Sequence, residues 1–151
     1  MTSINAIIGA RELVTVDRST SVVEAARRMA AHRIGALPVV HGDQLAGIFT
    51  ERDILVRVVA ASLDPAATTV GDCMSTELIT ADVGEPYEAC LQRMQQRHVR
   101  HLILLHQGRL AGILSLRDLM AVDLNEKAET ISLLHAYVHD IPPNSQLNGR
   151  L

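Results

Sequence analysis

Apolar and polar positions alternate with two different periods along the first part of the chain. A short apolar run at Leu13–Val16 predicts a strand. Apolar residues then recur at intervals of three and four, which predicts a helix over Val22–His32. Ser21 and Glu24 form a capping-box pattern at the start of this helix. The chain is therefore expected to begin with a strand followed by an amphipathic helix.

Two further strands and a second helix complete the pattern. Leu37–Val40 and Leu45–Phe49 are apolar runs of strand length, and the residues between them are typical of a turn between antiparallel strands. Glu51–Ala61 is expected to be the second helix. The same order then returns, as a strand at Leu78–Ala81, a helix over Pro86–Gln96, strands at Leu102–Leu105 and Leu110–Leu114, and a helix from Leu116.

The return of the pattern reflects an internal repeat. Residues 13–53 align without a gap on residues 78–118, at a constant offset of 65. A repeated unit of this kind buries its apolar face against its copy. We therefore expect an α/β (α+β) fold in which two β-α-β-β-α repeats pack with pseudo-two-fold symmetry, and sites at their seam that occur in pairs. The identical positions include Thr15/Thr80, Arg28/Arg93, Gly47/Gly112, Arg52/Arg117 and Asp53/Asp118.

The repeats divide the chain into segments. We assign residues 1–62 to the first repeat, 63–71 to a linker and 72–123 to the second repeat. A C-terminal helix is expected over residues 124–140, and residues 141–151 are expected to be a flexible tail. The apolar residues of this helix share one face, which needs a partner in the repeat core or in another subunit. They are Leu124, Ala128, Ile131, Leu134 and Val138.

The composition limits the classes of function. Of the 151 residues, 48% are hydrophobic and 21% charged, which suits a core that folds without disulfides or metals. A net charge of -3 and 2% aromatic residues argue against nucleic acid or an anionic membrane as partner. No apolar stretch reaches the length of a membrane span and no secretory pattern occurs, so a cytoplasmic location is expected. Cys73 and Cys90 are expected to stay reduced.

The motif that carries chemistry lies just after each predicted hairpin. Thr50-Glu51-Arg52-Asp53 matches Ser115-Leu116-Arg117-Asp118, and a glycine precedes each motif by three residues. A single hydroxyl residue followed by an aspartate three positions later is most simply a helix cap. Two such motifs in register favour a binding function, in which the helix N-terminus and the hydroxyl face a phosphate and the carboxylate accepts hydrogen bonds from both ribose hydroxyls. The pair of motifs therefore indicates a nucleotide.

The gapless pair, the strand Gly35-Ala36-Leu37-Pro38-Val39-Val40 and the two Thr/Ser-x-Arg-Asp signatures resemble cystathionine-beta-synthase-type (CBS) repeats, over about residues 13–122. The chain is similar to stand-alone bacterial members of this family, whose two repeats form a Bateman module. The resemblance implies two clefts that bind an adenine nucleotide, AMP in the first place and otherwise ADP, ATP, NAD or S-adenosylmethionine, with no required cofactor. It also implies a homodimer and a regulatory action on an unidentified partner protein.

The resemblance also assigns roles to residues. The ribose-binding carboxylates match Asp53 and Asp118, and the hydroxyls on the phosphate side match Thr50 and Ser115. The adenine base is expected against main-chain groups of the first strand and of the strand after the helix. These segments are Thr15-Val16 with Gly35-Ala36-Leu37, and Ile79-Thr80 with Arg100-His101-Leu102. Arg52 and Arg117 are either phosphate ligands or solvated surface charges.

Two features of the second copy depart from the first. Ile103 stands where the first copy has Pro38, so the proline that usually fixes the entry to that strand is missing. Arg100 and His101 match an Arg-His pair that is common in stand-alone members, and a basic pair at the cleft mouth favours phosphorylated ligands; the alternative is an exposed polar loop. The second site is therefore expected to be the one that binds a mononucleotide.

Other functions find less support in the sequence. His135 and His139 stand one helical turn apart, but two ligands do not make a zinc site, so no metal is expected. Neither a nucleophile motif nor a glycine-rich phosphate loop occurs, and the symmetric placement of the two aspartates favours binding over catalysis. The alternative from another class is a constitutive interaction scaffold, whose clefts are non-functional and whose C-terminal helix docks a partner.

Overall fold

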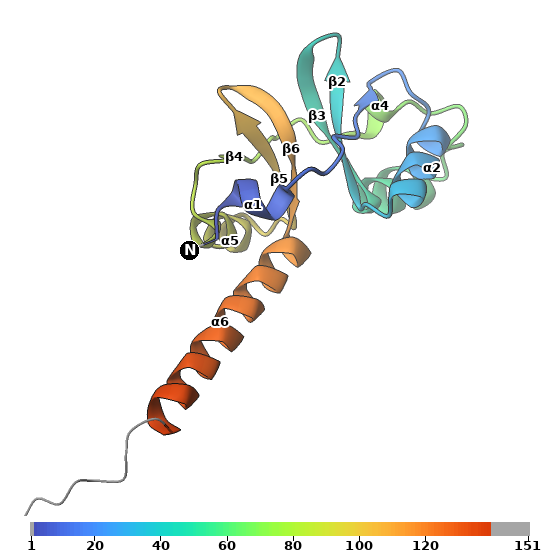
Figure 1. Cartoon of the computed structure of the whole chain (residues 1–151). Helices are drawn as coiled ribbons and strands as arrows, with labels where there is room; N and C mark the ends of the chain where they lie inside the picture. The colour runs from blue at the N-terminus through green and yellow to red at the C-terminus, as the bar shows by residue number, and fades with distance from the viewer. Residues whose placement is uncertain (1, 140–151) are drawn as a thin grey trace, which may run out of the picture.

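Two three-stranded sheets of identical topology form the centre of the molecule (Figure 1). The computed structural model describes residues 2–139. In each sheet the first strand pairs in parallel with the second, and the second pairs antiparallel with the third. The strands are β1 (Val16–Asp17), β2 (Ala36–His41) and β3 (Gln44–Thr50) in the first sheet, and β4 (Thr80–Asp82), β5 (His101–His106) and β6 (Arg109–Ser115) in the second. The predicted α/β class with two equivalent repeats is confirmed.

The two sheets share their register as well as their order. Pro38 pairs with Ile48, and at the equivalent positions Ile103 pairs with Ile113. Each hairpin also has one register shift, at equivalent positions. Isoleucine in place of proline therefore leaves the strand register unchanged. It adds one hydrogen bond, because the Ile103 N–H donates to the carbonyl of Ile79 at 3.0 Å and a proline has no N–H to donate.

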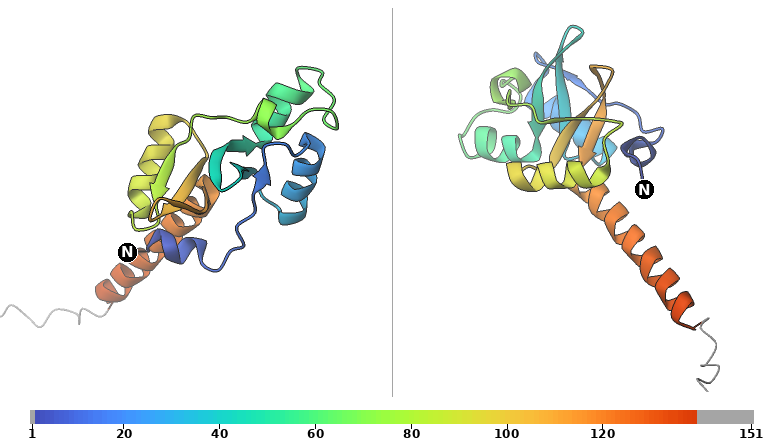
Figure 2. Two further views of the ribbon diagram at one scale, coloured as in Figure 1. Left: turned by 90° about the horizontal axis from the view of Figure 1, so that it is seen from above. Right: turned by 90° about the vertical axis from the view of Figure 1, so that its left-hand side faces the viewer.

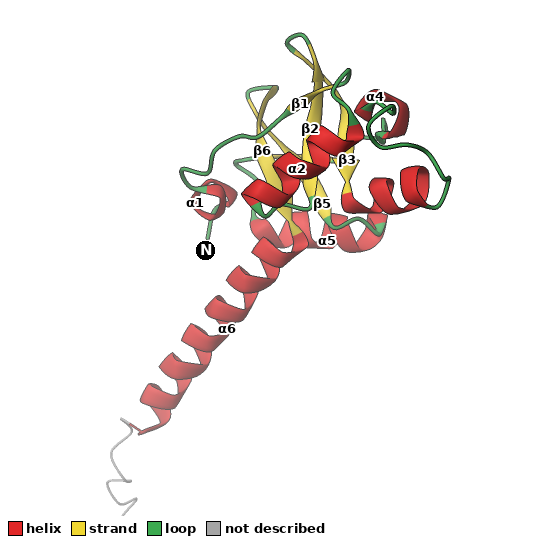
Figure 3. Cartoon of the chain, turned by 90° about the vertical axis from the view of Figure 1, so that its right-hand side faces the viewer, coloured by secondary structure: helices red, strands yellow, loops and turns green. Residues whose placement is uncertain are grey.

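The first helix of each repeat forms where the apolar spacing predicts it. The helix α2 (Val22–His32) has its predicted bounds, and the Ser21 hydroxyl accepts a hydrogen bond from the Glu24 N–H at 3.3 Å. It lies across one face of the first sheet (Figure 3). The helix α5 (Tyr87–Arg97) begins one residue later than predicted, with Pro86 as its N-cap. The bounds of these two helices agree with the sequence-based prediction to within one residue.

The first strand of each repeat is displaced from its predicted position. The predicted strand at Leu13–Val16 is found at Val16–Asp17, and the one at Leu78–Ala81 is found at Thr80–Asp82. Only the residues that reach the register of the second strand can pair with it, and residues 13–15 lie outside the paired part of the first sheet. An apolar run thus predicts a strand without deciding which of its residues pair.

The second helix of the first repeat differs from the prediction. The chain makes one α-helical turn, α3 (Glu51–Asp53), and then a π-helix, η1 (Ile54–Val59). Over so few residues, the apolar spacing of a π-helix is hardly distinguishable from that of an α-helix. Arg57 on η1 donates to the carbonyls of Cys73 at 3.2 Å and Met74 at 2.8 Å. These bonds tie η1 to the short helix α4 (Val70–Cys73).

The predicted linker at residues 63–71 ends inside the first hydrophobic core. Val70 is fully buried there, and its N–H donates to the carbonyl of Thr20 at 2.8 Å. Beyond α4, Ser75 exchanges two hydrogen bonds of 2.9 Å with Ile48 on β3. Gly47 beside it is needed for this approach, because a Cβ there would lie 2.7 Å from the Ser75 carbonyl oxygen. The connection between the repeats is therefore packed against the first sheet.

The helices predicted before and after residue 124 are one continuous helix, α6 (Leu116–His139). Its first turns pack on the second repeat, where Leu119 is fully buried. Beyond them α6 extends away from the rest of the molecule (Figures 1 and 2). The predicted apolar face is exposed there, at Leu124, Ala128, Ile131, Leu134 and Val138. The predicted tail at residues 141–151 lies outside the described residues.

Each repeat has its own hydrophobic core. The first surrounds Phe49 and Leu37, and the second surrounds Leu102 and Leu104. The N-terminal helix α1 (Ile4–Ile8), assigned from sequence to the first repeat, packs on the second, with Ile4 fully buried. The free cysteines are both buried, Cys73 in the first core and Cys90 in the second. The two cores meet along the seam where β2 lies against β6.

Candidate ligand clefts between the repeats

Two clefts lie along the seam between the repeats. One has a volume of about 660 Å³ and contains Asp118, and the other has a volume of about 720 Å³ and contains Asp53. We call them the Asp118 cleft and the Asp53 cleft. Each joins the carboxylate motif of one repeat to the second strand of the other, since Ala36 on β2 lines the Asp118 cleft and Ile103 on β5 lines the Asp53 cleft. The residues of one copy therefore do not form a site by themselves.

The two motifs adopt the same hydrogen-bonded geometry. Asp53 Oδ2 accepts from the Thr50 N–H at 2.9 Å and from the Thr50 hydroxyl at 3.1 Å, and the Asp53 N–H donates back to that hydroxyl at 3.3 Å. At Asp118 the corresponding distances to Ser115 are 3.1, 2.7 and 3.1 Å. Both aspartates thus cap a helix through Oδ2. The capping interpretation and the ligand interpretation do not compete, because each carboxylate has a second oxygen.

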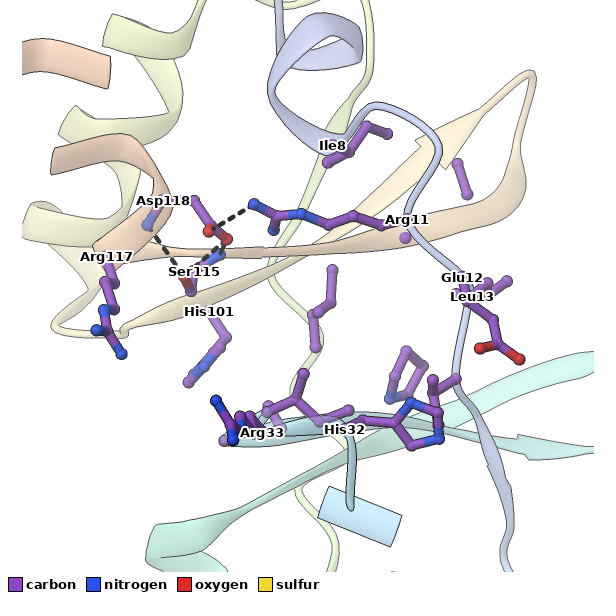
Figure 4. A pocket seen from close by; sticks show the side chains of 18 of the residues that line it. Ile8, Arg11, Glu12, Leu13, His32, Arg33, His101, Ser115, Arg117 and Asp118 are labelled. Atoms are coloured by element: carbon purple, nitrogen blue, oxygen red, sulfur yellow. Dashed lines mark hydrogen bonds and ion pairs between the residues drawn. The ribbon is translucent and has the colours of Figure 1, made fainter. Parts of the chain in front are cut away.

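The second oxygen, Oδ1, has different partners in the two clefts. Asp118 Oδ1 accepts a hydrogen bond from Arg11 Nη2 at 2.9 Å, as drawn in Figure 4. Asp53 Oδ1 lies 3.7 Å from Arg57 Nε, which is beyond hydrogen-bonding distance. The Asp118 and Asp53 side chains are 19% and 11% exposed, so each oxygen is sheltered but reachable from its cleft.

Two groups of the site have shifted pKa values. Burial acts to raise the pKa of Asp118, but the hydrogen bonds from Arg11 and Ser115 outweigh burial and hold the pKa below its ordinary value of 3.8. His101 lines both clefts, and burial, together with the charge of Arg100, lowers its pKa below 6.5. At neutral pH the Asp118 carboxylate is therefore charged and His101 is neutral, so the predicted basic pair carries its charge on Arg100.

A basic residue in the left-handed backbone conformation stands at equivalent positions of the two clefts. Arg33 (φ 54°) ends α2 and lines the Asp118 cleft, and His98 (φ 53°) ends α5 and lines the Asp53 cleft. Glycine or asparagine usually takes this position, because a larger residue is sterically disfavoured in that conformation. A strained residue retained in both repeats at a cleft favours a function for its side chain.

Most residues predicted for the sites line a cleft. Arg52 and Arg117 are exposed but belong to these walls. The predicted residues in the Asp118 cleft are Gly35, Ala36, His101, Ser115, Arg117 and Asp118. Those in the Asp53 cleft are Gly35, Thr50, Arg52, Asp53, Ile79, Arg100, His101, Ser115 and Arg117.

The other predicted residues line neither of the two clefts. The Thr15 carbonyl accepts a hydrogen bond from Arg28 Nη1 at 3.1 Å, and the Thr80 carbonyl accepts one from Arg93 Nη1 at 2.8 Å. Arg28 and Arg93, which the two repeats share, thus hold the main chain at the first strand of each repeat. The remaining side chains belong to the hydrophobic cores, which is where an apolar strand residue between two layers packs. They are Val16, Leu37 and Leu102.

Several residues of the Asp118 cleft were not predicted from the sequence, among them Arg11, Leu13 and Arg33. Arg11 precedes the aligned repeats, so comparison of the two copies has no counterpart with which to single it out. Leu13 belongs to an apolar run that predicts a strand. Arg33 follows a predicted helix and lacks the glycine that usually signals a left-handed end. For Arg11 the signal was absent, because only folding brings the N-terminal segment to this cleft.

Metal sites and membrane spans are both absent from the part of the chain that the structure describes. Between residues 2 and 139, no group of three or more histidine, cysteine, aspartate or glutamate side chains is placed to hold a metal ion. None of the helices within those bounds is both long and apolar enough to cross a membrane.

The fold and the paired clefts define a tandem-repeat module in which both repeats contribute to each candidate site. The sequence profile described as "CBS domain" matches residues 7–60 and 70–125. The chain belongs to the CBS domain family.

Relatives of known sequence and structure support this assignment. The chain is 35% identical over 131 residues to the CBS domain-containing protein YhcV of Bacillus subtilis, covering 85% of this chain and 93% of that protein. The structure of a putative signal-transduction protein with CBS domains from Burkholderia ambifaria matches with a TM-score of 0.74 and 29% identity, covering 96% of this chain and all of that one. The CBS domain protein PAE2072 of Pyrobaculum aerophilum, solved in complex with AMP, matches with a TM-score of 0.69 and 26% identity, covering 78% and 89% of the two chains.

Proposed function

We propose that this protein is a regulatory module that binds adenine nucleotides in the Asp118 and Asp53 clefts and passes their occupancy on to a partner protein. AMP is the first candidate, and ADP, ATP, NAD and S-adenosylmethionine are the others. The complex of the Pyrobaculum relative with AMP supports the choice of an adenine nucleotide. The protein then acts by binding and needs no catalytic residue or cofactor.

The proposal rests on the different roles of the two carboxylate oxygens in each aspartate. Oδ2 of Asp53 and of Asp118 is committed to capping a helix, which fixes the carboxylate in one orientation. Oδ1 takes no part in the cap, so a pair of ribose hydroxyls can donate to it at Asp53, and at Asp118 once Arg11 has moved away. Because this geometry occurs twice in the same register, it is expected to serve the same class of ligand twice.

The dimensions and charges of the clefts also suit a nucleotide. Their volumes of about 660 and 720 Å³ fall within the range of small-molecule sites. Arg33 and Arg117 line the Asp118 cleft, and Arg52 and Arg100 line the Asp53 cleft, so each has guanidinium groups for a phosphate.

Isothermal titration calorimetry with AMP, ADP, ATP, NAD and S-adenosylmethionine tests the proposal. The wild type should bind an adenine nucleotide with up to two molecules per chain. Asp53→Asn and Asp118→Asn keep an acceptor oxygen for the helix cap but remove the charge, and each should weaken its own cleft by about 10- to 100-fold. Asp43→Asn, on an exposed turn, is the matched control. Absence of binding by the wild type at millimolar nucleotide would refute the proposal.

A second candidate function rests on the exposed apolar face of α6. In this alternative the protein is a constitutive interaction scaffold whose clefts stay empty, and α6 docks a second copy or another protein. The expected homodimer belongs to both candidates. Ile131→Glu and Leu134→Glu alter exposed residues of this face, whereas Glu129→Gln alters an exposed residue of α6 outside it. Light scattering that shows assembly lost in the first two variants, with no nucleotide binding by the wild type, would favour the scaffold.

A further inference from the structure

The N-terminal segment crosses from one repeat to the other over the Asp118 cleft. The helix α1 is held on the second repeat by the buried Ile4 and by a hydrogen bond of 2.9 Å from the Thr2 N–H to Glu126 Oε1. The chain then returns to the first repeat to form β1. Between these anchors, Arg11 and Leu13 line the Asp118 cleft (Figure 4). The equivalent segment of the second repeat, around Thr76, supplies no arginine to the Asp53 cleft.

Arg11 extends from this segment toward the carboxylate that the proposed function assigns to ribose (Figure 4). Its Nη2 lies 2.9 Å from Asp118 Oδ1, and its side chain is 54% exposed. An ion pair with one partner half in solvent is worth about 1 kcal/mol or less, so Arg11 can leave Asp118 at little cost. The guanidinium is therefore placed to occupy this oxygen without being locked onto it.

Arg11 and a ribose compete for acceptor sites on the Asp118 carboxylate. A carboxylate has about four lone-pair sites, two on each oxygen. Two donors from Ser115 fill Oδ2 of Asp118, and Arg11 takes one site on Oδ1, so a single site remains for a ligand. Thr50 likewise fills Oδ2 of Asp53, but no donor among the described residues is within hydrogen-bonding distance of its Oδ1. Oδ1 of Asp53 can therefore accept from two ribose hydroxyls, whereas at Asp118 Arg11 occupies one of the two sites on Oδ1.

We propose that Arg11 is a specificity-determining residue, which covers Asp118 in the empty cleft and yields it only to a ligand that brings its own phosphate. When a nucleotide binds, its phosphate replaces the Asp118 carboxylate as the anionic partner of Arg11. The guanidinium donates to the phosphate, and the ribose hydroxyls donate to Asp118 Oδ1. Adenosine offers no such anion, so its binding leaves Arg11 without a partner. The Asp118 cleft therefore selects nucleotides over nucleosides, and the Asp53 cleft does so less. This inference rests on the proposed function.

Calorimetry with AMP and adenosine on Arg11→Gln and Arg11→Lys tests it. In the Asp53→Asn chain the Asp118 cleft is the tighter of the two. There Arg11→Gln should lower the ratio of AMP affinity to adenosine affinity by at least about 10-fold, because AMP loses a charge-assisted bond and adenosine loses a competitor. Arg11→Lys keeps the charge and should retain part of the ratio. Arg27→Gln, exposed on α2 and outside both clefts, is the matched control.

The outcomes separate this inference from the proposed function. If the wild type binds AMP and Arg11→Gln leaves the ratio unchanged, or strengthens AMP as much as adenosine, the specificity role is wrong and the nucleotide function stands. If the wild type binds no adenine nucleotide, both are wrong. In the Asp118→Asn chain the ratio should respond little to Arg11→Gln, because the unaltered Asp53 cleft is then the tighter site. Should Asp53→Asn fail to fold, the same ratio is measured on the otherwise unchanged chain, with the Asp53 cleft as an internal reference.

Discussion

The two repeats predict opposite effects for one substitution at equivalent glycines. A Cβ added at Gly47 would lie 2.7 Å from the Ser75 carbonyl oxygen and 2.7 Å from Met74 Sδ. The carbonyl cannot retreat without breaking the two 2.9 Å hydrogen bonds between Ser75 and Ile48. At Gly112 the nearest atom to an added Cβ is Ile8 Cδ1 at 4.0 Å, which is ordinary contact. The repeat symmetry therefore fails at this position, and the failure is measurable.

The magnitudes follow from two terms. Replacing a strand glycine by alanine gains about 0.5–1 kcal/mol in either repeat, because the unfolded chain loses freedom. Overpacking adds a cost of about 1–3 kcal/mol at Gly47 alone. Gly112→Ala should thus raise the free energy of unfolding by up to about 1 kcal/mol, and Gly47→Ala should lower it by up to about 2.5 kcal/mol. For a chain of this size the melting temperature changes by about 2–4 °C per kcal/mol.

Thermal unfolding of the two variants beside the wild type, checked by urea denaturation, measures the difference. Gly47→Ala is expected to melt up to about 10 °C below the wild type and Gly112→Ala at or above it. Because the strand term is the same in both variants, the gap between them reports the clash with Ser75 by itself. Equal shifts of the same sign would refute the reasoning and would mean that the connection between the repeats gives way.

Three further predictions concern the clefts. The folded-state pKa of Asp118 lies below 3.8, so its stabilising contribution is present above pH 3.8 and is lost as the pH falls through the folded value. Thermal unfolding at a series of acidic pH values should therefore show a smaller loss of melting temperature for Arg11→Gln than for the wild type. NMR titration of the His101 imidazole should give a midpoint below 6.5 that moves upward when AMP binds, and an unmoved midpoint would place the phosphate elsewhere. Arg33→Gly removes a left-handed arginine whose cost is about 1–2 kcal/mol and adds about 0.4–1 kcal/mol of unfolded-state freedom. It should raise the free energy of unfolding by up to about 1.6 kcal/mol and weaken AMP binding in calorimetry. A stable variant with unchanged AMP affinity would contradict a phosphate role for Arg33.

The repeat, the order of the elements and the capping motifs can all be predicted from the amino-acid sequence alone. The offset of 65 predicts two sheets of the same register, and apolar spacing over a full helix predicts Val22–His32 at its observed bounds. These features are local, because a helix cap needs only residues three positions apart and an amphipathic helix needs only its own period. For the same reason, spacing along the chain is enough to pair Thr50 with Asp53 and Ser115 with Asp118.

Which residues share a cleft depends on how the two repeats pack, and the sequence does not predict it. Asp118 shares its cleft with Ala36 of the other repeat and pairs with Arg11 of the N-terminal segment, and the separations of these residues along the chain carry no signal of that proximity. The tertiary structure also decided that α6 continues unbroken and that Gly47, but not Gly112, is pressed against another segment. Such differences arise because a repeated sequence folds into two copies with unequal neighbours. Each copy carries the same local pattern, and only packing distinguishes them.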